Sequence, residues 1–270
     1  MRKRLFYDRV SFTADTDDIT IIQPRYIHEI HVSLQCLQNG ATAPTLADIL
    51  SVINKVQVKL TGKIVTELSG QDILAYNAIA QNRSVKYLVP AADNELGLVE
   101  GLAIPLALAA GAHVLSIRFL HTSVATIDTE KLSFSTLESD KALARTHVEM
   151  PSFTFTPPST GAFNTALDAT FDGLVTGFLI YSTTIPTTAS DTATVRKLRI
   201  KVGGDIIYED NWNNLAAQTH YPEDSTLRAI CDNYVYLDFS DDPIAKGARV
   251  EIEIYSDDTN TVKIIPVIRV

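Results

Sequence analysis

The chain has 270 residues, of which 46% are hydrophobic and 20% are charged. This composition excludes an intrinsically disordered chain, and the length suits one large domain or two ordinary ones. The net charge of −9 means that the surface as a whole should repel nucleic acid. The two cysteines, Cys36 and Cys231, are too few for a disulfide scaffold.

The first half of the chain is predicted to form mainly short strands, at residues 10–12, 19–22, 27–34, 85–89 and 132–134. These segments are rich in β-branched and aromatic residues and are separated by turn-forming residues. The apolar stretch 96–120 is interrupted by Glu100, Pro105 and Arg118. We therefore expect buried sheet there and not a bilayer-spanning helix, which needs about 20 apolar residues. Helical patterns in the chain are limited to residues 46–53, 70–80, 141–148 and 212–218.

Residues 55–75 have the pattern of a strand, a turn, a second strand and a helix. Apolar and polar residues alternate over 55–60, which is the period of a half-buried strand. Thr61 and Gly62 then provide a tight hairpin turn before a second short strand at 64–65. Ser69 is placed to cap a helix that begins at residue 70.

The same pattern recurs in the second half of the chain, where Gly203 and Gly204 provide the turn and Asn211 is placed to cap the helix. Lys197 lies 142 positions after Lys55 (197 − 55 = 142), and from these two residues onward six of 21 aligned positions are identical. A repeat this long indicates a duplicated domain and not a solenoid.

Further strands in the second half are predicted at residues 153–155, 174–181, 234–239 and 262–270. We therefore expect a first domain at 1–140, a charged linker at 141–151, and a second domain at 152–270 with the same topology. Many short strands with turn-rich connections favour an all-β, antiparallel fold, either a sandwich or a jelly roll, over a parallel sheet.

The sequence contains no phosphate-binding loop, nucleophile elbow or zinc-binding helix motif. We therefore predict no catalytic residue, no cofactor and no enzymatic activity. His28 and His31 would point to opposite faces of a strand, which disfavours a shared metal ion. The acidic groups at residues 15–18, 241–242 and 257–258 are either Ca²⁺ ligands or solvated loop tips, so the metal content stays open.

The densest positive cluster is at the N-terminus, where Arg2, Lys3 and Arg4 precede the apolar and aromatic residues 5–7. Basic groups beside an apolar patch are typical of an interfacial anchor. These three residues are candidates to contact lipid headgroups or a genome. The alternative is a frayed end that only adds solubility.

The strand–turn–strand–helix pattern occurs twice, at residues 56–64 with 67–73 and at residues 198–217. These two copies indicate a family resemblance. The chain resembles the double jelly-roll major capsid proteins of tailless icosahedral viruses, the lineage of adenovirus and of bacteriophages with an internal membrane. In size it is closest to the corticovirus type. The larger members carry long tower insertions, for which this chain has little room.

The resemblance implies two tandem antiparallel jelly rolls with a few short helices, placed side by side in each chain. Three chains would form a homotrimer with a pseudo-hexagonal outline that tiles the shell of a virion. The implied partners are further copies of the chain, and with them an internal lipid membrane and minor capsid proteins. Sequence-specific binding of nucleic acid is not implied, and the acidic net charge fits a shell around a membrane.

Two other classes of protein have a similar fold pattern. A carbohydrate-binding or adhesive β-sandwich protein would have an aromatic binding face, but the chain has one Trp, and most of its Tyr and Phe alternate within strands. An enzyme on a duplicated cupin scaffold would need clustered His and carboxylate ligands. The six His of this chain are scattered.

Overall fold

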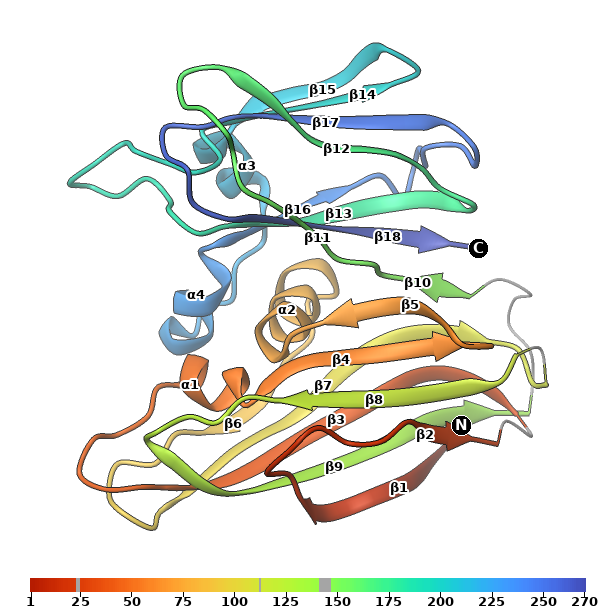
Figure 1. Cartoon of the computed structure of the whole chain (residues 1–270), viewed down its shortest axis with the longest axis vertical. Coiled ribbons are helices and arrows are strands. Elements are labelled where there is room, and N and C mark those ends of the chain that lie inside the picture. The colour runs from red at the N-terminus through yellow and green to blue at the C-terminus, as the bar shows by residue number, and fades with distance from the viewer. Residues whose placement is uncertain (23–24, 112, 141–146) are drawn as a thin grey trace. The chain divides into compact units, whose positions relative to one another are not determined.

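The computed structural model describes the whole chain except residues 23–24, 112 and 141–146. The chain divides into two compact units, Met1–Glu149 and Met150–Val270 (Figure 1). This division falls within the expected linker 141–151. Most of the helical pattern at 141–148 lies outside the described residues.

Unit 1 consists of strands with three short helical segments. Its strands are β1 (Arg2–Ser11), β2 (Ile19–Ile21), β3 (Tyr26–Gln38), β4 (Ile53–Leu60), β5 (Lys63–Leu68), β6 (Lys86–Leu88), β7 (Leu96–Leu108), β8 (Leu115–His121), β9 (Ile127–Ser139) and β10 (Val148–Glu149). Its helices are α1 (Leu46–Ser51), α2 (Gly70–Ala75) and the π-helix η1 (Tyr76–Ala80). The apolar stretch 96–120 thus forms β7 and most of β8, as predicted.

Unit 2 has the same kind of composition. Its strands are β11 (Phe153–Phe155), β12 (Phe163–Thr170), β13 (Leu174–Ser182), β14 (Lys197–Val202), β15 (Asp205–Asn211), β16 (Tyr234–Asp238), β17 (Arg249–Tyr255) and β18 (Val262–Arg269). Its helices are α3 (Trp212–Gln218) and α4 (Ser225–Cys231).

The two units share one strand order. In unit 1 the sheets run β1–β9–β3–β7–β6 and β2–β8–β4–β5, and in unit 2 the corresponding orders are β11–β18–β13–β16 and β12–β17–β14–β15. Neighbouring strands pair antiparallel. Eight strands of unit 2 thus each have a counterpart at the same place in unit 1, whereas β6 is an additional edge strand of unit 1. This is the arrangement of two jelly rolls built on one plan.

The repeated segment explains why these strands form where they do. In β4 the buried side chains Val56, Val58 and Leu60 alternate with more exposed ones. In β14 Leu198 and Ile200 do the same. Because successive side chains of a strand point to opposite faces, this alternation places one face of each sheet against the core of its own unit.

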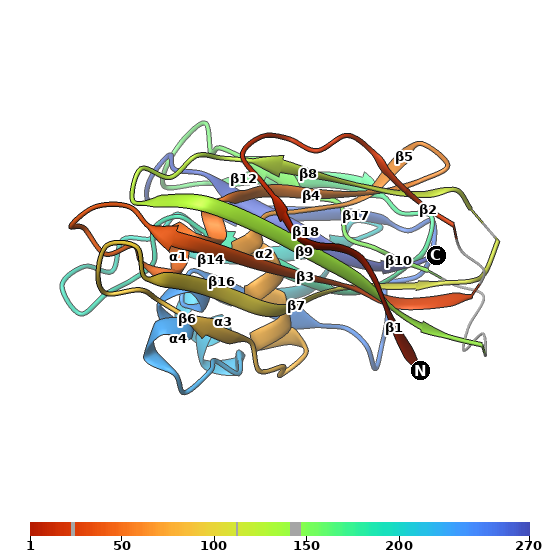
Figure 2. The same ribbon diagram turned by 90° about the horizontal axis from the view of Figure 1, so that it is seen from below.

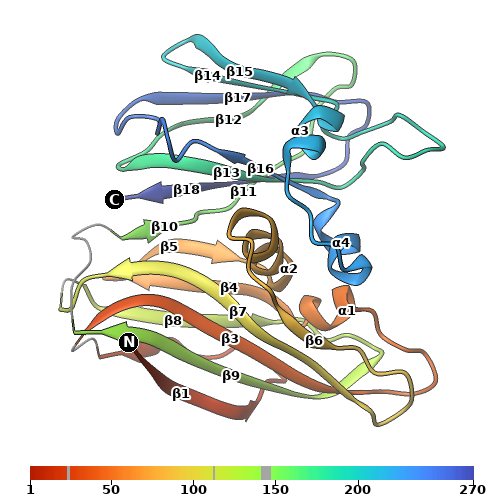
Figure 3. The same cartoon turned by 180° about the vertical axis from the view of Figure 1, so that it is seen from behind.

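The predicted helix caps are both observed. Ser69 accepts a hydrogen bond from the backbone of Asp72 and forms a reciprocal capping box with it at the start of α2. Asn211 accepts one from the backbone of Asn214 at the start of α3. The helix predicted at 46–53 ends earlier, at Ser51, because Ile53 already belongs to β4. Figure 3 shows α1 and α2 at the same end of the unit 1 sheets.

The two hairpin turns have the backbone geometry that their sequences indicate. Thr61 and Gly62 have φ of +50° and +86°, and Gly203 and Gly204 have φ of +60° and +97°. Two consecutive positive values are typical of the type I′ turn, whose twist matches that of the flanking strands. A Cβ atom added to Gly62 or Gly204 would meet nothing within 4 Å, so the conformation and not space demands glycine.

Replacing Gly62 or Gly204 by valine is therefore expected to cost roughly 1–2 kcal/mol each, because a β-branched residue is strained at positive φ. Thermal unfolding of the two variants measures the effect. Thr61→Ser is the matched control, since it keeps a side chain at the neighbouring turn position, and it should be nearly neutral. Unchanged midpoints in both valine variants would contradict the turn assignment.

Candidate functional site

The basic residues of the N-terminus lie in a paired strand. Arg2, Lys3 and Arg4 open β1, which is the edge strand of its sheet, and they pair with residues 136–138 of β9 (Figure 2). The guanidinium of Arg2 is 3.9 Å from the carboxylate of Asp140. The terminus is therefore paired in a strand and not frayed, and the role of its basic residues stays a prediction.

The basic side chains at the beginning of β1 differ in the contacts that they make. Arg4 donates a hydrogen bond to the carbonyl oxygen of Ile22 at 3.2 Å and lies 4.8 Å above the ring of Phe6. Lys3 is exposed and has no ionic partner in the part of the chain that the structure describes. Leu5, next in the strand, is 55% exposed. The beginning of β1 thus combines available positive charge with exposed apolar surface.

A second exposed feature lies on the edge strands β5 and β15, each the last strand of its sheet. Ile64 is 42% exposed and its repeat counterpart Ile206 is 53% exposed (64 + 142 = 206). An edge strand with exposed apolar side chains is a site where another chain can add. The two units therefore present a similar candidate contact edge.

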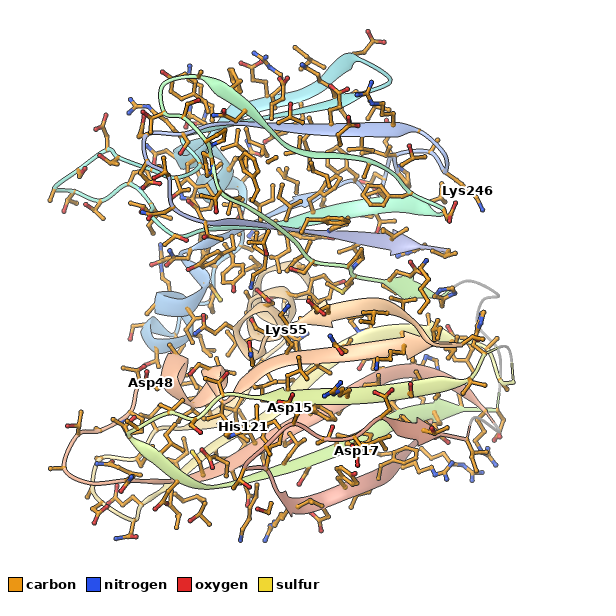
Figure 4. All side chains as sticks on the ribbon, in the orientation of Figure 1. Asp15, Asp17, Asp48, Lys55, His121 and Lys246 are labelled. Carbon is orange, nitrogen blue, oxygen red and sulfur yellow. The ribbon has the colours of Figure 1, made fainter. Side chains whose placement is uncertain are left out.

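The acidic groups that were candidates for Ca²⁺ largely contact the chain itself. Asp15 accepts a hydrogen bond from the backbone N–H of His121 at 2.9 Å (Figure 4), and Asp18 pairs with Lys59 at 2.7 Å. Asp257 pairs with Arg196 at 3.1 Å. Among the residues described, no group of three or more His, Cys, Asp and Glu side chains is positioned to hold a metal ion.

His28 and His31 do not share a ligand. His28 Nε2 lies 2.9 Å from the Ser139 hydroxyl, whereas His31 Nε2 lies 2.9 Å from the carboxylate of Glu29. Arg83 forms two further hydrogen bonds to the Glu29 carboxylate, at 2.6 and 2.9 Å. The hydrogen bond from His31 lowers the pKa of Glu29 most, partial burial opposes this, and Arg83 also lowers it, so that the pKa falls to about 2.

Acidification is expected to remove up to about 3 kcal/mol of the stability of unit 1 through Glu29. The pKa of its carboxyl falls from 4.5 to about 2 on folding. Its contribution is therefore complete above pH 4.5 and is lost as the pH falls through 2. Thermal unfolding at about pH 6 and pH 2.5 measures this loss. In Glu29→Gln the fall in midpoint between the two pH values should be smaller, and an equal fall would contradict the assignment.

Both cysteines are buried and free. Burial raises the pKa of the Cys36 thiol to about 11 and that of Cys231 to about 12. Since the thiolate is the reactive form of cysteine, neither thiol has the properties of a nucleophile at neutral pH.

One feature that the fold assembles was not predicted from the sequence, an open pocket in each unit. Each pocket lies where the first residues of β4 or β14 approach the cap of the following helix, at Ser69 and Asn211. The residues that line each pocket come from segments far apart in the chain, so no local sequence pattern predicts the pocket. The internal repeat was the available signal, because it relates the two pockets to each other.

Comparison with known proteins identifies the architecture. No protein-family model matches the sequence, and no curated protein matches it. The major capsid protein of STIV, the Sulfolobus turreted icosahedral virus, matches with a TM-score of 0.75 at 14% identity, over 99% of this chain and 96% of that chain. The chain has the double jelly-roll fold.

Other matches to double jelly-roll proteins span equally large parts of both chains. The major capsid protein P2 from bacteriophage PM2 has a TM-score of 0.61 at 13% identity, over 99% of this chain and 96% of that chain. The PBCV-1 virus capsid structure has a TM-score of 0.58 at 9% identity, over 99% and 92%. The predicted fold class, with its two tandem jelly rolls, is thereby confirmed. At these identities the matches establish the fold alone.

Proposed function

We propose that the chain is the major capsid protein of an icosahedral virus and is located in the virion. The observation that supports this most is the use of the whole chain for two jelly rolls of one plan. The capsid proteins of STIV and PM2 match over nearly the full length of both partners. The role is structural, and we assign no catalytic residue.

The proposed assembly unit is a homotrimer. Three chains supply six jelly rolls, so that a threefold assembly presents nearly sixfold edges and fills a shell lattice. Exposed apolar residues on the edge strands β5 and β15, among them Ile64 and Ile206, support contacts of this kind. Minor capsid proteins would complete the shell.

The first residues of β1 are proposed to face the particle interior. Arg2, Lys3 and Arg4 would contact the headgroups of an internal membrane, or the genome where no membrane is present. Their position beside the exposed Leu5 supports an interfacial role. Among the described residues, no helix is long and apolar enough to cross a bilayer.

Light scattering of the purified protein tests the proposal. We expect a stable species near 88.8 kDa, three times the chain mass of 29.6 kDa, because obligate interfaces often bury more than about 2,000 Å². Electron microscopy of the source material should show icosahedral particles. A monomer at micromolar concentration in assembly buffer, or source material without particles, would contradict the proposal.

A further inference from the structure

The strand pairing of the two units relates their residues to one another. Val32 in β3 and Ile180 in β13 each lie three residues after the first register shift of their strand (32 − 29 = 3 and 180 − 177 = 3). Val32 pairs with Phe134 of β9, and Ile180 pairs with Ile264 of β18. Phe134 and Ile264 are therefore counterparts in the two jelly rolls.

The same pairing shows which segment corresponds to the beginning of β1. Of these two counterparts, the first also pairs with Tyr7 of β1 and the second with Phe153 of β11. Tyr7 thus corresponds to Phe153. Lys3 lies four residues before the one and Glu149 four residues before the other (7 − 3 = 4 and 153 − 149 = 4). The basic beginning of β1 therefore corresponds to β10.

An ion pair joins β10 to β5 within unit 1. The ammonium of Lys63, the first residue of β5, lies 3.7 Å from the carboxylate of Glu149 in β10, and Figure 1 shows the two strands. The repeat counterpart of Lys63 is Asp205, the first residue of β15 (63 + 142 = 205). Both members of the pair are thus reversed in charge, because β15 begins with a carboxylate and β1 begins with cations.

The reversed charges are unpaired within the chain. Asp205 and Lys3 are exposed, and neither forms an ion pair in the part of the chain that the structure describes. When both members of a pair change sign, their attraction is kept. The contact that Lys63 makes with Glu149 therefore has an electrostatic equivalent between Asp205 and Lys3.

The apolar surface beside Asp205 is also open. Ile207 and its counterpart Val65 are the bulge residues of β15 and β5 (65 + 142 = 207). Val65 is 2% exposed, whereas Ile207 is 46% exposed and borders an open pocket of about 300 Å³ that Val202 and Phe239 also line. A position that is covered in unit 1 is thus uncovered in unit 2.

We propose that the beginning of β1 of one copy binds to β15 of a second copy. Lys3 pairs with Asp205, and Leu5, which is 55% exposed, packs beside Ile207. Alternate residues of a strand share a face, so Lys3 and Leu5 make the two contacts together. The inference rests on the proposed homotrimer, in which three such contacts close the ring.

Charge favours a second copy over an anionic partner at this surface. Asp242 lines the open pocket, Asp241 precedes it, and Asp205 pairs with the lining residue Val202. Lys246 is the cation that follows this loop. A surface with three carboxylates repels nucleic acid and anionic lipid but attracts the basic beginning of β1. The single carboxylate of Asp205 takes one cation, which leaves the other two for the interior surface.

Charge reversal with rescue tests the contact in the full chain by analytical ultracentrifugation. Lys3→Glu and Asp205→Lys should each lower the association constant of the trimer about tenfold, because each places like charges at three contacts. The double variant Lys3→Glu/Asp205→Lys should return to within about threefold of the unaltered chain. Lys131→Glu/Asp205→Lys is the matched control, since Lys131 is also exposed but lies in β9, and it should not recover.

Cross-linking tests the same contact where the trimer is too stable to dissociate. Lys3→Cys/Asp205→Cys treated with a short bismaleimide should give linked chains up to 88.8 kDa, three times 29.6 kDa. The native thiols do not compete, because burial raises the pKa of Cys36 to about 11 and that of Cys231 to about 12. Lys131→Cys/Asp205→Cys is the control and should stay at 29.6 kDa.

Recovery in the reversed double variant, or linkage between copies, supports the inference. It is overturned if the double variant does not recover and the bismaleimide product stays at the mass of one chain, which includes a link within one chain. A stable trimer with neither recovery nor linkage would refute this inference alone and leave the capsid proposal standing. An unaltered chain that is monomeric at micromolar concentration would contradict both.

Discussion

Phe134→Ala is expected to cost about 3–5 kcal/mol of unfolding free energy and to release β1 from its sheet. Phe134 is 1% exposed. Its ring stacks on Phe6 at 5.4 Å and contacts the edge of Tyr7 at 5.2 Å, both in β1, and it lies 5.4 Å from Phe119 in β8. Its removal leaves a cavity where the first strand is joined to the core.

Phe178→Ala is the matched control, because this residue is also fully buried but lies in unit 2, where Phe239 is its ring neighbour at 6.0 Å. Both variants should lose similar stability in chemical denaturation. Hydrogen exchange separates them, since only Phe134→Ala should expose the amides of residues 2–11 under native conditions. Protection of β1 that is equal in the two variants would show that Phe134 does not hold this strand.

The parts of the fold that the sequence predicts well are those with a strong local period. The hairpins that turn at Gly62 and Gly204 combine clean alternation with turn residues and a helix cap, and each is found at the predicted place. The length of the longer strands was not predictable in the same way. β3 runs from Tyr26 to Gln38, well beyond the predicted 27–34. Burial alternates up to the end of the strand, but the last buried position is the polar Gln38, so the apolar pattern does not mark the extension.

Among the elements that were not predicted, β12 and α4 were missed for different physical reasons. β12 (Phe163–Thr170) has a mixed polar sequence with little burial, and its pairing with β17 defines it more than an apolar pattern does. α4 did carry a signal: Asp224 caps it, and Leu227, Ile230 and Cys231 have helical spacing and are buried. The open pockets had no local signal, because tertiary folding brings their lining residues together.

The N-terminal cluster gives the second large expected effect. Replacing Arg2, Lys3 and Arg4 by glutamine should leave the fold intact but reduce binding to anionic lipid vesicles roughly a hundredfold for each chain. The estimate follows from about 1 kcal/mol for each basic residue near an anionic surface. Substitution is preferable to deletion, because these residues pair with β9 and their removal would expose its edge.

A second triple variant, in which Lys86, Lys131 and Lys246 become glutamine, controls for total charge. These exposed lysines lie outside the beginning of β1, and either set changes the net charge from −9 to −12 (−9 − 3 = −12). Vesicle cosedimentation and electron microscopy of assembled particles provide the measurements. Since many copies act together in a shell, the loss for each chain should be amplified into a low yield of closed particles for the N-terminal variant alone. Equal vesicle binding and equal particle yield in the two variants would contradict the proposal that Arg2, Lys3 and Arg4 lie on the interior surface.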